Sequence, residues 1–155
     1  MKRIGIIGAG LMGRWHAQRL TRLPAELVGF YDIIPAAAQG AAESFNCRAF
    51  STREALLAEV DAVLVVTPTP THCQVVLAAA AAGVDIFCEK PMARHLRECQ
   101  EMIAACERSG SRLSIGQVVR FFPEFATAKE VLDSGAIGRP GVIRTTRGGS
   151  HPLKE

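Results

Sequence analysis

Long apolar runs and clusters of basic residues are both missing from this sequence. Its 155 residues include 18 Lys and Arg and 15 Asp and Glu, and the basic residues are scattered rather than grouped. Scattered charge of this size offers no footprint for nucleic acid or an anionic membrane. No apolar stretch approaches the roughly 20 residues that cross a bilayer, and the first three residues lead into a strand pattern rather than a signal peptide. We therefore expect a cytoplasmic protein without nucleic-acid or membrane partners.

Aromatic residues and paired cysteines are also scarce. Aromatic residues make up 6% of the chain and apolar residues 48%, a balance typical of an α/β protein rich in Ala and Val. The only tryptophan, Trp15, and its neighbour His16 are expected to pack within the fold. The five cysteines are odd in number and lack C-x-x-C spacing, which argues against a disulfide framework and favours small buried side chains. His95 and Cys99 have the spacing of half a metal site, but no further ligands accompany them, so no metal is expected.

The most informative segment runs from residue 4 to residue 32. An apolar strand pattern is followed by Gly8-Ala9-Gly10-Leu11-Met12-Gly13, a helix pattern, a second apolar strand pattern and Asp32. A G-x-G-x-x-G loop is weak evidence alone, but a preceding strand, a following helix and an acid about 20 residues later together indicate a dinucleotide site. All six loop residues are therefore predicted to contact the cofactor.

Each glycine of that loop has a separate physical task. Gly8 allows the tight turn after the strand, Gly10 lets the backbone approach the pyrophosphate, and Gly13 lets the helix pack closely on the strand. The pyrophosphate is then expected at the N-terminal end of the helix that begins near Leu11, where free N–H groups and the helix dipole favour an anion.

Asp32 predicts which dinucleotide is bound. It follows Gly13 by 19 residues and ends the second strand, where a carboxylate can accept hydrogen bonds from the adenosine ribose hydroxyls. The same charge repels the 2′-phosphate of NADP, and the next residues, Ile33, Ile34 and Pro35, provide no arginine to receive it. We therefore predict NAD as the cofactor in preference to NADP.

Strand and helix signals alternate along the rest of the chain. Helices are expected at 35–45, from a Ser51–Glu54 capping box to 59, from a Thr71–Gln74 capping box to 83, at 94–109 and at 123–134, and strands at 48–50, 61–66, 85–89 and 112–117. The run at 61–66 is apolar after its first residue, as in a central parallel strand buried on both faces. The predicted fold is therefore α/β, with a doubly wound parallel Rossmann sheet.

Three regions are expected along the chain. Residues 1–122 form the dinucleotide-binding domain, residues 123–140 a helix and a linker with Gly and Pro, and residues 141–155 the start of a second α/β domain. Within the last region, 142–147 has the pattern of the first strand of that domain, with no further element to pair with it. Such an exposed edge leaves open a dimer formed with a second copy.

Functional side chains are expected in loops at the carboxyl ends of the strands, because ligands of an open parallel sheet bind there. Besides the glycine loop, three segments there are distinctive: 67–72, 88–91 and 117–123. They resemble, in that order, a T-P-T-x-x-H run, the E-K-P motif and the sixth-strand R-F motif of the glucose-fructose oxidoreductase and inositol dehydrogenase (Gfo/Idh/MocA) family. The resemblance extends over nearly the whole chain. It implies an NAD(P)-dependent oxidoreductase that acts on a small molecule, namely a sugar, a polyol or a related hydroxy compound.

By this resemblance Lys90 is the catalytic residue and also contacts the cofactor and the substrate. It would exchange a proton with the substrate hydroxyl while hydride passes between the substrate carbon and nicotinamide C4. The chemistry of the side chain agrees, because a lysine loses its proton more readily when desolvated. Pro91 in addition restricts the backbone at Lys90.

Glu89 and two residues of the 117–123 segment carry more open expectations. Glu89 is expected to contact the cofactor. It either orients Lys90, touches the nicotinamide ribose or pairs with a nearby cation. Gln117 is expected on the nicotinamide side of the cofactor. Arg120 either binds the substrate or forms a structural ion pair.

For the loop that ends at His72, the family implies a place along the cofactor. Thr67, Pro68 and His72 are the expected contacts, mainly through the backbone. The alternative is that Thr71 caps the following helix and His72 lies in its first turn.

Members of that family continue into a second α/β domain that forms the far wall of the substrate pocket and supplies an Asp and a His. Neither is found here, and His151 is not given that role. The sequence is thus expected to be the N-terminal part of a longer oxidoreductase, binding cofactor but turning over weakly or not at all on its own. The alternative is a non-catalytic dinucleotide-binding module, such as a regulatory subunit or a sensor. Retention of Lys90 in its motif argues against that alternative.

Overall fold

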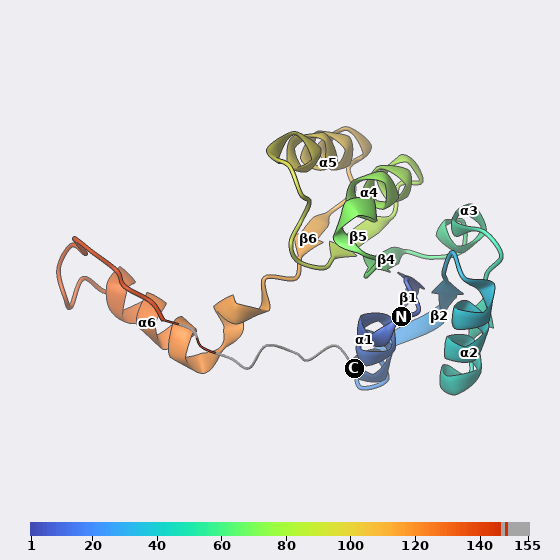
Figure 1. Ribbon diagram of the computed structural model, residues 1–155, viewed down its shortest axis with the longest axis horizontal. Coiled ribbons are helices and arrows are strands. Elements are labelled where there is room, and N and C mark those ends of the chain that lie inside the picture. Colours follow the sequence, from blue (N-terminus) through green and yellow to red (C-terminus); the bar gives the residue numbers. More distant parts are fainter. Residues whose placement is uncertain (147, 149–155) are drawn as a thin grey trace. The chain divides into compact units, whose positions relative to one another are not determined.

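The computed structural model describes residues 1–146 and 148. They fall into two compact units, Met1–Gln117 and a unit that begins at Val118, and each is described by itself. In the first unit six strands form one sheet, parallel throughout, in the order β3-β2-β1-β4-β5-β6. The strands are β1 (Lys2–Ile7), β2 (Ala25–Tyr31), β3 (Arg48–Ala49), β4 (Ala62–Val65), β5 (Asp85–Cys88) and β6 (Leu113–Ile115). This is the doubly wound sheet that the sequence predicts, and Figure 1 labels most of its elements.

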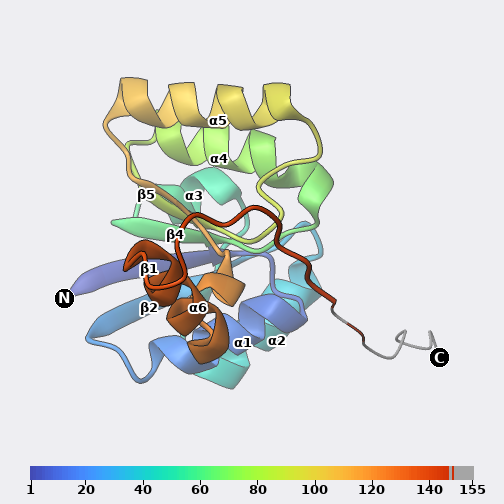
Figure 2. The same cartoon turned by 90° about the vertical axis from the view of Figure 1, so that its left-hand side faces the viewer.

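Helices connect the strands and cover both faces of the sheet. They are α1 (Leu11–Leu20), α2 (Pro35–Phe45), α3 (Arg53–Leu57), α4 (His72–Ala81) and α5 (Leu96–Ser109), with the single-turn helix η1 (Thr69–Thr71) before α4. Figure 2 shows α1 and α2 on one face of the sheet and α4 and α5 on the other. The chain winds outward from β1 through β2 and β3 on one side and through β4, β5 and β6 on the other. The reversal between β1 and β4 is where such sheets bind ligands, beyond the carboxyl ends of the strands.

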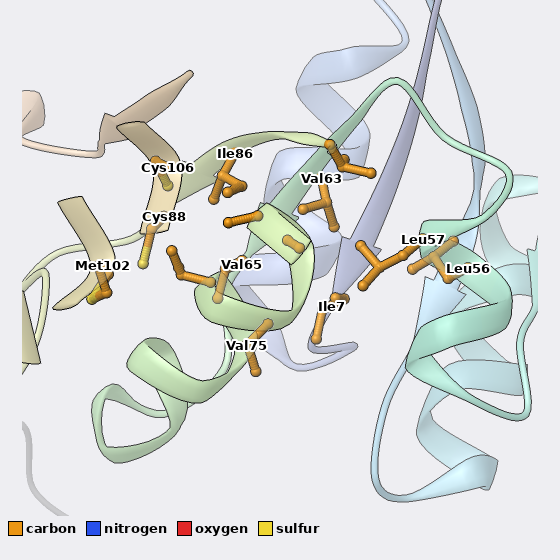
Figure 3. Close-up of a cluster of buried hydrophobic side chains, with 14 of the residues drawn as sticks. Ile7, Leu56, Leu57, Val63, Val65, Val75, Ile86, Cys88, Met102 and Cys106 are labelled. Atoms are coloured by element: carbon orange, nitrogen blue, oxygen red, sulfur yellow. The ribbon is translucent and has the colours of Figure 1, made fainter. Parts of the chain in front are cut away.

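Alternation of side chains along β1 divides the core into two clusters. Ile6 packs with Phe30 on the side of α1 and α2, whereas Ile7 packs with Val65 and Val75 on the opposite face. All five side chains are at most 5% exposed. Figure 3 shows the cluster around Ile7. Full burial of an aliphatic side chain contributes about 1.5–3 kcal/mol, so these clusters hold the helices against the sheet.

Two helices begin differently from the prediction. Thr52, not Ser51, caps α3, because its hydroxyl accepts a hydrogen bond from the N–H of Ala55 at 3.1 Å. The Thr71 hydroxyl does not cap α4. It donates back to the carbonyl of Pro68 at 2.8 Å, because the turn of η1 comes between the loop and the helix. The capping box predicted at Ser51 was therefore wrong about the residue. The one predicted at Thr71 was right about the N-cap position but wrong about the side-chain hydrogen bond.

A third helix start gives His95 a role other than metal binding. His95 is the N-cap of α5, and the Glu98 carboxylate accepts its backbone N–H at 3.2 Å. Within residues 1–146 and 148, no group of three or more His, Cys, Asp or Glu is placed to hold a metal ion. In the same residues, none of the helices has both the length and the apolar character needed to cross a bilayer.

The second unit contains η2 (Val118–Phe121) and α6 (Pro123–Asp133). Residues 142–146 form no strand, so the strand predicted at 142–147 is not found in the part of the chain that the structure describes. A single strand has no neighbour to satisfy its backbone hydrogen bonds, which is the physical reason for this outcome. The possible dimer with a second copy stays a prediction. Arg147 and residues 149–155, with His151, lie outside the described residues.

An ion pair at the amino end of β5 predicts how stability changes in acid. Hydrogen bonds from the Arg112 side chain and backbone N–H hold the pKa of the Asp85 carboxyl at about 2, below its ordinary 3.8. A carboxyl with a lowered pKa in the folded state adds stability above its ordinary pKa, and that stability is lost as the pH falls through the folded-state pKa. We expect Asp85→Asn to lower the Tm at pH 7, with the difference from the parent shrinking between about pH 4 and pH 2. Thermal denaturation at each pH measures this, and an undiminished difference at pH 2 would contradict it.

Candidate functional site

The glycine loop joins β1 to α1 beside the strand reversal. Gly8 has a φ of 108°, which residues with side chains rarely adopt, and its N–H donates to the carbonyl of Tyr31 at 2.8 Å. A Cβ on Gly13 would overlap the carbonyl oxygen of Gly8, so α1 lies closer to the end of β1 than a larger residue would permit. Both glycines therefore have the structural tasks that the sequence predicts.

Gly10 faces open space. A Cβ placed there would meet no atom within 4 Å, in contrast to Gly8 and Gly13. Gly10 is also the N-cap of α1 and has no side chain with which to cap it, so the first N–H groups of the helix, from Leu11 onward, remain available to a ligand. Free room beside a helix N-terminus is what a pyrophosphate needs. The loop residues thus fit the group that the sequence predicts.

Asp32 follows β2, and its carboxylate is fixed by the glycine loop. Its Oδ2 accepts the N–H of Ala9 at 2.7 Å, and its Oδ1 accepts the N–H of Ile34 at 2.9 Å. Each carboxylate oxygen has a further lone pair, so Asp32 can still accept two hydroxyl donors. The carboxylate and the loop are held together by the fold itself, as recognition of a ribose next to a pyrophosphate requires.

The loop after β4 is held by a buried histidine. His72 is 1% exposed, and its Nε2 and Nδ1 lie 2.8 and 3.0 Å from the carbonyl oxygens of Thr67 and Pro91. The side chain is therefore occupied within the fold, and the cofactor contact expected of His72, mainly through the backbone, stays a prediction. It ties the loop after β4 to the loop after β5. The cofactor contacts of Thr67 and Pro68 stay predictions.

Glu89, directly after β5, has a partner on each carboxylate oxygen. Its Oε1 lies 2.8 Å from Nε2 of His16 on α1, and its Oε2 accepts the backbone N–H of Lys90 at 3.0 Å. Glu89 thus contacts both the backbone of Lys90 and the His16 ring, and its cofactor contact stays a prediction. His16 does pack, with its ring centroid 5.4 Å from that of Phe87, but sequence reasoning missed its polar partner. No local signal could have found it, because the two residues are 73 positions apart.

Lys90 and Gln117 are both exposed at the edge where the parallel strands end. The peptide bond between Lys90 and Pro91 is cis. Arg120 belongs to the second unit, where its side chain is exposed. The catalytic role of Lys90, the cofactor contact of Gln117 and the substrate contact of Arg120 stay predictions.

Cys88 lies next to Glu89 but has no reactive character. Burial raises the pKa of the Cys88 thiol to about 12, so the thiol stays protonated and is a poor nucleophile. Cys106 is buried as well, whereas the other three cysteines are partly buried. The prediction of small buried side chains is confirmed for Cys88 and Cys106.

A groove of about 490 Å³ lies at the opposite edge of the sheet. Lys2, Asp61 and Asp85, from the amino ends of the strands, line part of it. Ligands of open parallel sheets bind beyond the carboxyl ends, where the glycine loop, Asp32 and Lys90 lie. We therefore assign the functional site to the glycine-loop edge rather than to this groove.

Comparison with known proteins identifies the family. Residues 2–117 match the family model GFO_IDH_MocA, described as an oxidoreductase family with an NAD-binding Rossmann fold. Inositol 2-dehydrogenase 3 from Saccharopolyspora erythraea is 38% identical over 143 residues, which cover 89% of this chain and 42% of that protein. UDP-N-acetylglucosamine 3-dehydrogenase from Acidithiobacillus ferrooxidans is 37% identical over 145 residues, which cover 94% of this chain and 45% of that protein.

Solved structures show the same relationship. The structure of the Acidithiobacillus ferrooxidans enzyme matches with a TM-score of 0.80 and 38% identity, over 84% of this chain and 43% of that one. Scyllo-inositol dehydrogenase from Lactobacillus casei, with bound NAD(H) and scyllo-inositol, matches with a TM-score of 0.81 and 27% identity, over 89% of this chain and 42% of that one. The chain thus spans less than half the length of the relatives it matches.

Proposed function

This chain belongs to the Gfo/Idh/MocA oxidoreductase family as its NAD-binding Rossmann domain, and on that premise we propose that it is the cofactor-binding half of an NAD-dependent dehydrogenase. The proposed substrate is a polyol or a sugar, whose CH–OH group is oxidised to a ketone. The inositol and UDP-N-acetylglucosamine dehydrogenases among its relatives support this class. For this chain itself the proposal covers cofactor binding and the supply of Lys90.

One observation carries the proposal. The open space beside Gly10 directly follows Ala9, whose N–H donates to the Asp32 carboxylate. In this arrangement the N–H groups at the start of α1 would hold the pyrophosphate, and the Asp32 carboxylate would accept the ribose hydroxyls. The same edge of the sheet ends in Lys90, next to Glu89. A binding surface and a basic side chain suited to proton transfer are thus supplied by one rigid sheet.

The proposed chemistry divides between the cofactor and Lys90. When bound, NAD supplies a hydride acceptor at nicotinamide C4. Lys90 takes the proton of the substrate hydroxyl during oxidation and returns it during reduction. Glu89 accepts the backbone N–H of Lys90 and so holds the backbone of the residue that carries the amine. Hydride and proton leave the same CH–OH group, so the ketone forms without any further reactant.

Calorimetric titration of the 155-residue chain with NADH and NADPH tests the cofactor proposal. We expect NADH to bind at least about tenfold more tightly than NADPH, because a carboxylate near the ribose repels an added phosphate by about 1.4 kcal/mol or more. Asp32→Asn keeps an acceptor oxygen for Ala9 but removes the charge, so the two affinities should move to within about threefold of each other.

Glu43→Ala is the matched control, because it removes one negative charge from the exposed surface of α2. The preference for NADH should be the same in this variant as in the parent. Failure of a folded parent chain to bind NADH would refute the proposed function. An unchanged preference in Asp32→Asn would refute only the role of Asp32.

A further inference from the structure

Two mostly buried polar side chains from distant parts of the chain meet one residue before Lys90. Nε2 of His16 and Oε1 of Glu89 are 2.8 Å apart, and the side chains are 17% and 15% exposed. Removal of either side chain would leave the other mostly buried without its hydrogen-bond partner, which costs free energy.

The surroundings restrict Glu89 to this position. Its backbone N–H donates to the carbonyl of Val65 at 2.9 Å, which fixes the residue beside the end of β4. A Cβ on Gly116 would lie only 3.4 Å from Oε2 of Glu89, so the chain after β6 closes on the carboxyl group as well. The ring of His16 stands edge-on to Phe87, with 64° between the ring planes. These contacts therefore hold both side chains in the positions in which they face each other.

His16 lies on the helix that follows the glycine loop, less than one turn after Gly13. The second carboxyl oxygen of Glu89 accepts the N–H of Lys90 at 3.0 Å. Direct contacts therefore run from α1 through His16 and Glu89 to the backbone of Lys90. This pair therefore connects the element that would receive the pyrophosphate to the loop that carries Lys90.

We propose that His16 is a positioning residue, whose Nε2–H donates to Glu89 and thereby lets Glu89 hold the backbone of Lys90. The inference rests on the proposed function, because the place of Lys90 matters to the reaction only if Lys90 transfers a proton. His16 itself touches neither the substrate nor the reacting atoms. It acts by keeping the carboxylate of Glu89 in one orientation.

Two variants separate this hydrogen bond from simple packing. His16→Phe keeps a ring against Phe87 but has no N–H, whereas His16→Gln loses the ring but places an amide N–H close to where Nε2 lies. Amide hydrogen exchange of Lys90, followed by NMR on the cofactor-free chain, reports the bond to Glu89. We expect His16→Phe to speed this exchange about tenfold and His16→Gln to stay within about threefold of the parent, as the loss of one hydrogen bond implies.

Trp15→Leu is the control, because it removes a ring that stands edge-on to His16 at 6.0 Å and keeps both groups of the His16–Glu89 hydrogen bond. It should keep Lys90 exchange within about threefold of the parent. The inference would be overturned if the amide of Lys90 exchanged faster in His16→Gln than in His16→Phe, or at the same rate in all the proteins. Faster exchange in both His16 variants would also overturn it.

If His16→Phe does not fold, the nitrogen resonances of His16 in the parent decide the question. A proton on Nε2 supports the inference, and a ring protonated only on Nδ1 overturns it. These measurements need no cofactor, so they are distinct from the NADH titration. Absence of NADH binding would refute the proposed function, whereas the exchange and tautomer data judge His16.

Discussion

Gly13→Ala should destabilise the chain by about 3 kcal/mol or more, at the upper end of what overpacking causes. The added Cβ would overlap the carbonyl oxygen of Gly8, which is backbone and cannot move aside as a flexible side chain would. Gly8 is itself held at a positive φ and by its N–H bond to Tyr31, so the loop cannot shift without loss of the turn. Urea unfolding followed by circular dichroism measures the free energy of unfolding.

Gly10→Ala is the matched control for this substitution. It adds the same methyl group one position before the helix start, where nothing lies within 4 Å. Its stability should stay within about 1 kcal/mol of the parent, while NADH affinity falls about tenfold or more, because the methyl group occupies the room proposed for the pyrophosphate. Equal destabilisation by the two substitutions would contradict the close approach at Gly13. Unchanged NADH affinity in Gly10→Ala would contradict the place assigned to the pyrophosphate.

Lys90→Ala should lower kcat by about 10²–10⁴ in an enzyme of the relatives' full length that contains this chain, the usual contribution of a general acid or base. NADH affinity should change by less than about threefold, because the proposed cofactor contacts lie mainly at the glycine loop and Asp32. Steady-state kinetics with a polyol substrate, together with NADH titration of the same protein, measure the two quantities.

Lys90→Arg distinguishes proton transfer from simple charge. Arginine keeps the positive charge but does not give up its proton in proteins, so the variant should be about as inactive as Lys90→Ala. Lys129→Ala, which removes a lysine from α6, is the control and should retain the parent kcat. Substantial turnover in Lys90→Arg would show that charge rather than proton transfer is needed. Full turnover in Lys90→Ala would remove Lys90 from the mechanism.

Local sequence signals were sufficient for the parallel sheet and the cofactor loop. One short segment, residues 4–32, contains the G-x-G-x-x-G loop, the strand before it, the helix after it and Asp32. These signals can therefore be recognised without knowledge of the rest of the fold. The apolar run of β4 likewise shows its central position, because only a strand covered on both faces remains apolar throughout. The alternation of strands and helices predicts that this sheet is parallel and doubly wound.

Local spacing was insufficient to predict which residue caps a helix or whether an apolar segment forms a strand. Ser51 and Thr52 are both good caps, and the fold chose Thr52. The spacing of Thr71 and Gln74 also predicted a cap, but the prolines before α4 favour the turn of η1, which redirects the Thr71 hydroxyl. The apolar pattern at 142–146 resembled a strand, yet a strand needs a neighbour that the sequence pattern alone does not supply.

The sequence by itself determined the glycine loop, the acid that follows it, the lysine in its E-K-P motif and the parallel sheet that gathers them at one edge. Only the tertiary structure decided the hydrogen-bond partners of His16 and His72. His72 lies between carbonyls of two different loops, and His16 meets a carboxylate 73 positions away. The physical reason is that a polar side chain takes its partner from whatever packing places beside it out of water, and spacing along the chain carries no record of that neighbour.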